Sequence, residues 1–403
     1  MKILFISPYI PSETSGHAGA QLIYRNIISL ATSHQVRLIC FLEFSELEQE
    51  KKLQSLGINL DVVHIKRNIS RRSILSLFTQ TIPILRFIFL REPTMVAKNY
   101  NLRMSRLVKK VKRSFNPDIV QIEYNNMYHY AKHFNQKNTT LQEHDVTTIL
   151  KRRLYETSTK WLDRQLNYLE YRKWNSIEPK ILRKFHQVVT LTEEDLHFTK
   201  RWINIPEIRV IPPAVYTDIA LPVTKEKNCL VFVGSLNRIT NIQALELIIQ
   251  EIYPNVKVHH KNAKLKIAGK YLPNHLARYI KNYPNIEYHG FVDDIDTFIA
   301  SSSLFISPII SGAGLKMKTT HALACGTPVL TTSIGAEGIS ISEDDGLFVE
   351  DDIVKMTDKC NQLLMDHNLD QYGRRGKSRV EKLYSIKVIR EKWINLYNEI
   401  SKN

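Results

Sequence analysis

The sequence predicts an α/β protein made of two parallel-sheet domains. Its 403 residues exceed what a single hydrophobic core usually organises. Short apolar runs alternate with longer segments of helical periodicity, which is typical of βαβ units. A proline-containing stretch between Asn204 and Asn228 has the composition of an interdomain connection. We therefore expect one sheet on each side of this stretch.

The apolar runs define two series of expected strands. The first series comprises Lys2 to Ser7, Gln35 to Leu42, Leu60 to His64, Asp118 to Ile122, Thr140 to Glu143 and Gln187 to Leu191. The second series, which begins near Cys229, comprises LVFVG, LKIAG, IEYHG, LFISP and TPVLTT. The expected domains are residues 1–205 and 206–385. Residues 386–403 are expected to form a helix that packs back on the first domain, because its apolar residues recur at helical spacing.

The cysteines and the first residues indicate a cytoplasmic protein. Cys40, Cys229, Cys325 and Cys360 lie far apart in the sequence, so their spacing suggests neither a disulfide framework nor a zinc cluster. The apolar run in MKILFISPYIP is too short for a signal peptide and favours a buried strand.

The net charge of +16 indicates an anionic partner. Basic residues cluster in Arg103 to Arg113 and in Lys151 to Arg153. Nucleic acid, acidic phospholipid and anionic nucleotide all fit this charge. The sequence contains no zinc-finger spacing, no aromatic ribonucleoprotein motif and no regular basic repeat, so we expect no nucleic-acid partner.

The longest apolar stretch, from Ile74 to Leu90, is interrupted by polar residues and a proline. A spanning helix needs about 20 predominantly apolar residues, so this stretch is not expected to cross a membrane. Two interpretations stay open. It packs as a helix on the first sheet, or it lies on an anionic membrane surface beside its flanking arginines.

The segment from Ile306 to Ile339 contains the residues that are expected to bind a phosphate group. It reads as a strand, a glycine loop, a helix and a second strand. Gly312 and Gly314 let a bulky anion approach the backbone, and the helix expected from Leu315 favours phosphate at its N-terminus. Lys316 and Lys318 add positive charge. The alternative is a tight turn followed by solvated lysines.

Several motifs of the second half together resemble the family-4 retaining glycosyltransferases of the GT-B fold. They are FVGSLNRITNIQAL, GFVDDIDTFIASSSLFISP, SGAGLKMK and HALACGTPVLTTSIGAEGI, followed by the terminal helix. The resemblance implies transfer of a sugar from a nucleoside diphosphate sugar, with a UDP or GDP sugar favoured. The acceptor would be a glycan, a lipid-linked or a protein-linked molecule, in surface polysaccharide or glycoconjugate biosynthesis. The protein would work in the cytoplasm or peripherally on the inner face of the cell membrane.

The resemblance assigns most donor contacts to three loops of the second half. The pyrophosphate would be held by Gly314, Lys316 and Lys318, of which the two lysines would stabilise the leaving group. The full set of expected donor-side residues in this half is Gly234, Ser235, Asn237, Arg238, Gly290, Phe291, Val292, Gly312, Ala313, Gly314, Leu315, His321 and Glu337. Arg238 is equally compatible with a surface charge.

The sequence departs from the family at two positions. Many relatives carry two glutamates eight positions apart, where this chain has Ala313 and His321. A histidine can bond a ribose hydroxyl, whereas an alanine side chain cannot. Glu337 is an alternative polar contact, and it is equally compatible with a plain loop carboxylate.

In the first half, the resemblance points to residues that follow the expected strands. Gly16 belongs to a glycine-containing loop that would close over the donor. His144 would contact the transferred sugar or stabilise an oxocarbenium-like transition state, and Asp145 would fix its imidazole tautomer. Glu123 would lie near the acceptor. His144 and Glu123 can also be read as structural residues.

We expect retention of the anomeric configuration, with no cofactor and no metal ion. Asp293, Asp294 and Asp296 superficially resemble an Asp-x-Asp metal motif, but they read as the cap of a helix. Two alternatives remain. One is a sugar-nucleotide epimerase of the same architecture, and the other is a catalytically degenerate partner subunit that binds nucleotide.

Overall fold

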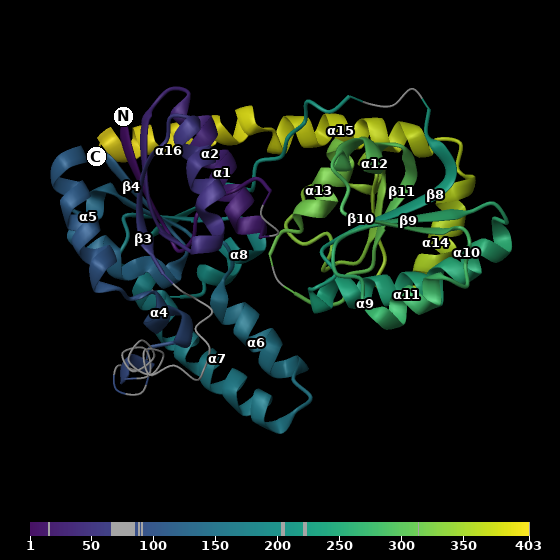
Figure 1. Ribbon diagram of the computed structural model, residues 1–403, viewed down its shortest axis with the longest axis horizontal. Helices are drawn as coiled ribbons and strands as arrows, with labels where there is room; N and C mark the ends of the chain where they lie inside the picture. Colours follow the sequence, from purple (N-terminus) through teal and green to yellow (C-terminus); the bar gives the residue numbers. More distant parts are fainter. Residues whose placement is uncertain are drawn as a thin grey trace. The chain divides into compact units, whose positions relative to one another are not determined.

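The computed structural model confirms the predicted α/β class with two parallel sheets. It describes residues 1–14, 17–65, 85–87, 89, 92–202, 206–220, 224–312 and 314–402. The chain divides into two compact units (Figure 1). Unit 1 contains Met1–Pro212 and Arg390–Asn403, and unit 2 contains Pro213–Ile389. The limits expected from the sequence were 205 and 385.

Unit 1 is built on a seven-stranded parallel sheet with the order β3-β2-β1-β4-β5-β6-β7. Its strands are β1 (Lys2–Ser7), β2 (Gln35–Leu42), β3 (Asn59–His64), β4 (Ile119–Glu123), β5 (Thr139–Gln142), β6 (Gln187–Thr190) and β7 (Glu207–Val210). The sequence predicted the first six. It missed β7 because EIRV is a short edge strand with only half-buried apolar residues. Strand order reverses direction between β1 and β4, so ligands are expected beyond the carboxyl ends of these strands.

Helices surround this sheet. They are α1 (Ala18–Ala31), α2 (Leu47–Ser55), α4 (Thr94–Asn99), α5 (Leu102–Phe115), α6 (Thr147–Thr157), α7 (Trp161–Leu182) and α8 (Glu193–Thr199), with 3-10 turns at Phe44–Glu46, Asn125–His133 and Gln136–Asn138. Helix α5 buries Met104, Val108 and Val111 at helical spacing against the sheet, which leaves its basic residues on the solvent side.

Unit 2 contains a six-stranded parallel sheet with the order β10-β9-β8-β11-β12-β13. The strands are β8 (Glu226–Val233), β9 (Lys264–Ala268), β10 (Ile286–Gly290), β11 (Ser302–Ser307), β12 (Val329–Thr331) and β13 (Leu347–Val349). The sequence predicted all but β13, whose three residues are too few for a clear pattern. Here the order reverses between β8 and β11, which again directs attention to the loops that follow these two strands.

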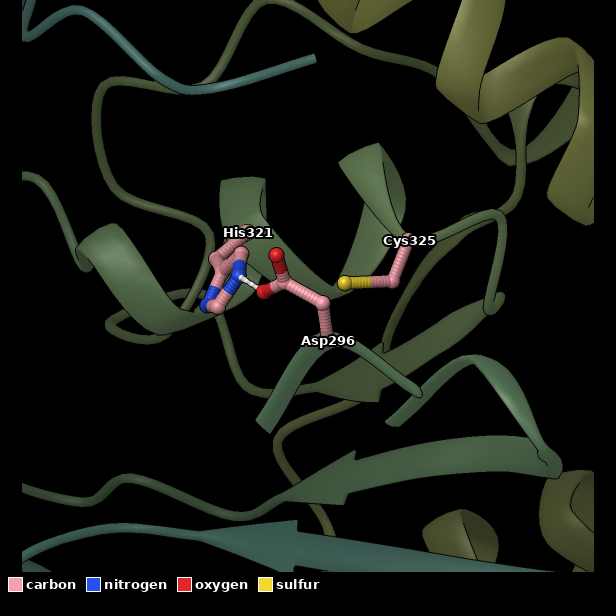
Figure 2. A group of neighbouring side chains, drawn as sticks. All are labelled: Asp296, His321 and Cys325. Atoms are coloured by element: carbon pink, nitrogen blue, oxygen red, sulfur yellow. Dashed lines mark hydrogen bonds and ion pairs between the residues drawn. The ribbon is translucent and has the colours of Figure 1, made fainter. Parts of the chain in front are cut away.

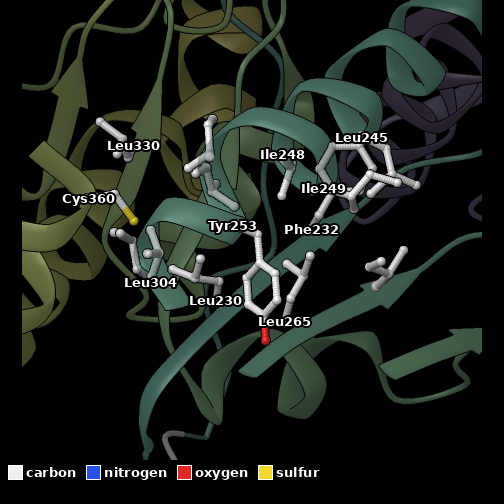
Figure 3. Packing of buried hydrophobic residues seen from close by; sticks show 14 of the residues in the cluster. Leu230, Phe232, Leu245, Ile248, Ile249, Tyr253, Leu265, Leu304, Leu330 and Cys360 are labelled. Atoms are coloured by element: carbon white, nitrogen blue, oxygen red, sulfur yellow. The ribbon is translucent and has the colours of Figure 1, made fainter. Parts of the chain in front are cut away.

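The helices of unit 2 cover this sheet on both faces. They are α9 (Ile239–Leu247), α10 (Tyr253–His259), α11 (Asn274–Ile280), α12 (Ile295–Ala300), α13 (Met317–Ala324), α14 (Ile353–Met365) and α15 (Leu369–Tyr384), with a 3-10 turn at Glu343–Asp345. A π-helical segment, Ile248–Ile252, joins α9 to α10. Figure 3 shows Ile248 and Tyr253 of this run packed on Leu230 and Leu265 of the strands. This apolar layer holds β8 and β9 rigidly below the candidate site.

The last helix, α16 (Ile386–Lys402), lies against unit 1 from Arg390 onward. Trp393 and Tyr397 are almost fully buried there. Arg390 Nη1 donates a hydrogen bond of 3.1 Å to Thr32 Oγ1, and Arg209 forms an ion pair of 3.0 Å with Glu399.

None of the helices in the described part of the chain has the length and apolarity needed to span a bilayer. Most of the apolar stretch from Ile74 to Leu90 lies outside the described residues, so the two interpretations of it stay open.

Candidate active site

The glycine loop follows β11 and leads into α13. Gly312 has φ +117° and Gly314 has φ +72°, which are conformations that side-chain-bearing residues rarely adopt. The helix begins at Met317 rather than at the expected Leu315, because the backbone of Lys316 is still extended. The free N–H groups of the first turn therefore follow the loop directly, where an anion is favoured. Ala313, in the middle of this loop, lies outside the described residues.

Two lysines flank the start of α13. Lys316 Nζ lies 3.7 Å from Glu337 Oε2 and also donates to the carbonyl oxygen of Gly314. Glu337 therefore lies beside the loop, where its carboxylate is close to a lysine. Lys318 Nζ donates to Asn241 Oδ1 at 2.7 Å and lies 4.8 Å from the centre of the Phe232 ring.

Burial, together with the nearby charges of Lys316 and Arg238, lowers the pKa of Lys318 to about 7. Three cationic side chains, those of Lys316, Lys318 and Arg238, are thus close enough for their charges to repel one another. An anion bound among them would remove this repulsion, which makes the region suitable for a pyrophosphate.

Asn241 joins the first loop of unit 2 to the glycine loop. Its amide nitrogen donates to the carbonyl oxygen of Ser235 at 2.9 Å, while its oxygen accepts the bond from Lys318. Gly234 is required here, because a Cβ atom would lie 2.9 Å from the Asn241 side chain. Sequence reasoning missed Asn241, although it lies within the quoted motif FVGSLNRITNIQAL and could have been sought at the first turn of α9.

Ser235 and Asn237 shape the rest of this first loop. Ser235 Oγ donates to Asn237 Oδ1 at 2.9 Å, and Arg238 occupies the N-cap position of α9. The loop approaches the next strand closely, since a Cβ on Gly269 would lie 1.9 Å from the carbonyl oxygen of Gly234.

The loop after β10 presents an exposed aromatic ring. Gly290 has φ +63°, and its carbonyl oxygen accepts a 2.7 Å hydrogen bond from the Gly269 N–H. Phe291 is 64% exposed, and Lys270 Nζ lies 4.3 Å from the centre of its ring. Val292 follows directly. A flat exposed ring supported by a cation is a suitable surface for stacking, and Lys270 is a neighbour that the sequence did not single out.

His321 is paired with a carboxylate. Its Nε2 lies 2.6 Å from Asp296 Oδ1, and Figure 2 shows both side chains beside the thiol of Cys325. Asp294 caps α12 by accepting a 3.0 Å bond from the Thr297 N–H, which confirms its expected capping role. The Asp296 pairing leaves only the other ring nitrogen of His321 for the expected ribose contact.

The ligand atoms of Asp296, His321 and Cys325 all lie within 4.8 Å of one another, so these residues could hold a metal ion. Cysteine spacing alone gave no sign of this group, because its members come from two helices. Burial strongly raises the pKa of the Cys325 thiol, which disfavours the thiolate that a metal needs. The expected independence from metal stays a prediction.

In unit 1, His144 follows β5 and is buried beside the end of β4. Its Nε2 lies 2.7 Å from Glu123 Oε2, and the ring of Tyr124 stacks on the imidazole with centres 3.8 Å apart and planes 6° apart. Glu123 thus provides a carboxylate contact that the sequence did not predict, since Asp145 was expected to orient this ring.

Glu123 is itself held by a polar network. Gln121 Nε2 donates to Glu123 Oε1 at 2.6 Å, and the hydroxyl of Tyr397 from α16 donates to Gln121 Oε1. Sequence reasoning missed Tyr397 because the contact joins residues that lie far apart in the chain. Gly16, the other expected residue of this half, lies outside the described residues.

A second buried acidic pair lies next to His144. Asn125 Nδ2 donates to Glu143 Oε1 at 3.0 Å and to Glu178 Oε1 at 2.7 Å. Burial raises the pKa of Glu143 well above its usual value, and the nearby Glu178 raises it further. The native protein therefore holds a proton at Glu143 under conditions in which an exposed glutamate has lost it.

This buried proton predicts a pH dependence of stability. Between the unfolded pKa near 4.5 and the higher native pKa, the native state binds more protons than the unfolded state, so the free energy of unfolding falls as the pH rises. Glu143→Gln should make the melting temperature less sensitive to pH between about pH 5 and about pH 8. Glu381→Gln on the surface of α15 is the control, and equal pH slopes in wild type and Glu143→Gln would contradict the prediction.

The comparisons with known proteins agree with this geometry. Residues 227–366 match the family model "Glycosyl transferases group 1". An uncharacterised 44.6 kDa protein in the cps region of Klebsiella pneumoniae is 23% identical over 88% of each chain. The capsular polysaccharide biosynthesis glycosyltransferase CapM of Staphylococcus aureus is 26% identical over 42% of this chain and 46% of its own length.

Solved structures show the same fold over almost the whole chain. Sucrose-phosphate synthase from Thermosynechococcus elongatus has a TM-score of 0.69 at 14% identity and covers 99% of this chain and 98% of its own. HepE from Anabaena in complex with UDP has a TM-score of 0.70 at 13% identity and covers 99% of this chain and 100% of its own.

These findings show the predicted GT-B fold over the chain and place a match to the group 1 glycosyltransferase family within residues 227–366, the part of the chain that carries the glycine loop. The chain's sequence relatives include proteins of capsule loci. The narrower assignment to family 4 stays a prediction.

Proposed function

We propose that the protein transfers a sugar from a nucleoside diphosphate sugar to a glycan, lipid-linked or protein-linked acceptor during the assembly of a surface polysaccharide such as a capsule. The observation that carries this proposal is the glycine loop after β11, with its two left-handed glycines and the neighbouring Lys316 and Lys318. The capsule-related relatives support the biological setting. The structurally similar HepE binds UDP and UDP-glucose, which supports a uridine nucleotide as the donor carrier.

The proposed reaction breaks the bond between the anomeric carbon and the β-phosphate oxygen of the donor. An acceptor hydroxyl forms the new bond on the same face of the sugar, so the configuration is retained. Its proton passes to the leaving phosphate. The negative charge that develops on this phosphate is stabilised by Lys316, Lys318 and the N–H groups at the start of α13.

The exposed Phe291 and the backbone of Gly290 and Val292 are proposed to lie beside the nucleobase, with Arg238 near the phosphates. We also propose that the reaction needs no metal ion and that the protein works in the cytoplasm, peripherally on the inner face of the membrane. If activity survives treatment with a chelator of divalent cations, the proposed metal independence is supported. If activity is lost and zinc, magnesium or manganese restores it, the proposed metal independence is contradicted.

The function is tested by incubating the protein with a panel of nucleotide sugars and a lipid extract. Release of free nucleoside diphosphate that depends on the extract supports transfer. An isomerised nucleotide sugar formed without an acceptor identifies an epimerase instead, and tight nucleotide binding without turnover identifies a degenerate binding protein. The anomeric coupling constant of the isolated product decides between retention and inversion.

A prediction concerns His144. Because a hydrogen bond to a charged group, here the transition state, contributes about 1.5 to 3 kcal/mol, His144→Gln should lower turnover about 10- to 100-fold with little change in nucleotide affinity. The glutamine amide can still donate to Glu123, which limits the damage to the buried network. Turnover and the dissociation constant for uridine diphosphate are measured together with the melting temperature. Normal turnover in this variant would make His144 a purely structural residue.

A further inference from the structure

Helices α6 and α7 form a hairpin in unit 1 whose outer part exposes several large apolar side chains. Figure 1 shows the two helices running side by side and projecting away from the sheet of this unit. The base of the hairpin is anchored, because Glu178 in α7 accepts hydrogen bonds of 2.8 Å from the N–H groups of Thr147 and Thr148. Trp174 and Ile181 bury this end of α7 in the core.

The outer half of α7 is different, because it exposes large apolar side chains. Trp161 is 69% exposed, Leu162 67%, Leu166 59% and Leu169 49%. The three leucines follow at spacings of four and three residues, which places them on one face of the helix. Apolar residues gathered on one helix face mark an interaction surface, whereas isolated ones are common on any protein.

The tip of the hairpin is ordered by its own contacts. The rings of Tyr155 and Tyr168 lie 5.2 Å apart, and Arg164 lies 5.2 Å from the centre of the Tyr155 ring. Asn167 Nδ2 donates to Ser158 Oγ at 2.9 Å. These contacts link α6 to α7 and leave the leucine face outside. The apolar surface is therefore presented by a defined element of structure.

Cationic residues dominate the outer part of this hairpin. They are Lys151, Arg152, Arg153, Lys160, Arg164 and Arg172, against the carboxylates of Glu156, Asp163 and Glu170. Glu156 is already paired with Arg152 at 3.3 Å. The hairpin combines a leucine face and a terminal tryptophan with surrounding lysines and arginines. An acidic bilayer complements this combination, because its apolar acyl chains lie beneath anionic headgroups. A second protein copy with the same charge would be repelled.

We propose that the outer part of the α6–α7 hairpin docks the protein on anionic membranes, with Trp161 and the leucine face in the headgroup boundary. This inference deepens the proposed function, since it rests on the idea that the acceptor is carried in a membrane. It differs from the interpretation of Ile74 to Leu90 as the membrane-binding segment, because it names described residues of another element.

The test uses the full-length protein and vesicles of phosphatidylethanolamine with phosphatidylglycerol, compared with vesicles of phosphatidylcholine. We expect binding to the anionic vesicles in a flotation assay, weakened by salt, and a blue shift of tryptophan fluorescence. Leu162→Ser/Leu166→Ser should lower vesicle affinity about tenfold or more, since the variant loses the apolar transfer of two leucine side chains into the bilayer boundary. Trp161→Phe should keep most of the binding but lose the blue shift.

Two matched controls distinguish binding through this surface from nonspecific apolar adsorption and from nonspecific electrostatic attraction. Val258→Ser removes an exposed apolar residue of α10, and Lys109→Gln/Lys110→Gln removes two charges of α5. Both should bind vesicles nearly as the wild type does, and all variants should bind uridine diphosphate equally. Equal vesicle binding by Leu162→Ser/Leu166→Ser, or a wild-type dimer that this change dissociates, would overturn the proposal.

Vesicle binding and sugar transfer fail independently in this design. A protein that binds vesicles but transfers no sugar contradicts the proposed function and leaves the docking surface supported. A protein that transfers sugar but ignores anionic vesicles contradicts the docking surface alone.

Discussion

Replacing Lys316 with alanine is expected to lower turnover by about two to three orders of magnitude, the size of effect that follows loss of a main charge contact in a transition state. The lysine lies two residues after Gly314, and its side chain is only 14% exposed, beside Glu337. In the proposed reaction its charge opposes the negative charge that grows on the leaving phosphate. The interaction is therefore stronger in the transition state than in the ground state, so turnover should fall more than donor binding.

Initial rates of nucleoside diphosphate release measure this effect, with donor affinity determined separately. Lys359→Ala in α14 is the matched control, because that lysine forms a 3.1 Å ion pair with Glu343 and takes no part in the proposed site. Lys316→Arg should recover part of the activity, since it restores the charge with a different geometry. Wild-type rates in a folded Lys316→Ala protein would remove this residue from the site.

Affinity for uridine diphosphate is expected to weaken as the pH rises above about 7, by up to about tenfold per pH unit. The pKa of Lys318 in the empty protein is lowered to about 7, first by burial and then by Lys316 and Arg238. Below that pH the ammonium is already charged when the ligand arrives. Above it the lysine is neutral, so binding must take up a proton, and the bound diphosphate holds that proton by raising the pKa.

Calorimetry in two buffers of different ionisation enthalpy measures this proton uptake directly. Lys318→Met should bind more weakly at about pH 6 and should lose the steep weakening at higher pH. Lys359→Met should keep the wild-type profile. A Lys318→Met protein with the same pH dependence as the wild type would show that another group takes up the proton.

The predictable part of the candidate site is the part whose chemistry lies within one short segment. Gly312, Gly314, Lys316 and Lys318 belong to a single strand, loop and helix, so their neighbourhood in space follows from their neighbourhood in the chain. The same reasoning found β11 and β12, whose apolar runs are bounded by turns. It failed for β7 and β13, since strands of only three or four residues carry too weak a pattern.

Contacts between distant segments were not predictable in this way. Asn241 meets Lys318 only because β8 and β11 are neighbours in the sheet, which places the loops after them together. Glu123 meets His144 across β4 and β5, and Tyr397 reaches their network from the end of the chain. A single sequence does not show which distant side chains come into contact, because side chains of the same types also follow other strands that do not meet.

The sequence by itself determined that this is a two-sheet α/β protein with a glycine and lysine loop that resembles those of group 1 glycosyltransferases. Those features depend on periodicity and on a contiguous motif, both of which are local. The tertiary structure alone decided that Lys318 lies buried among cations, that Glu143 retains a proton and that the leucine face of α7 remains uncovered. The physical reason is that pKa values and exposure depend on what surrounds a side chain, and the folded chain brings those surroundings from distant segments.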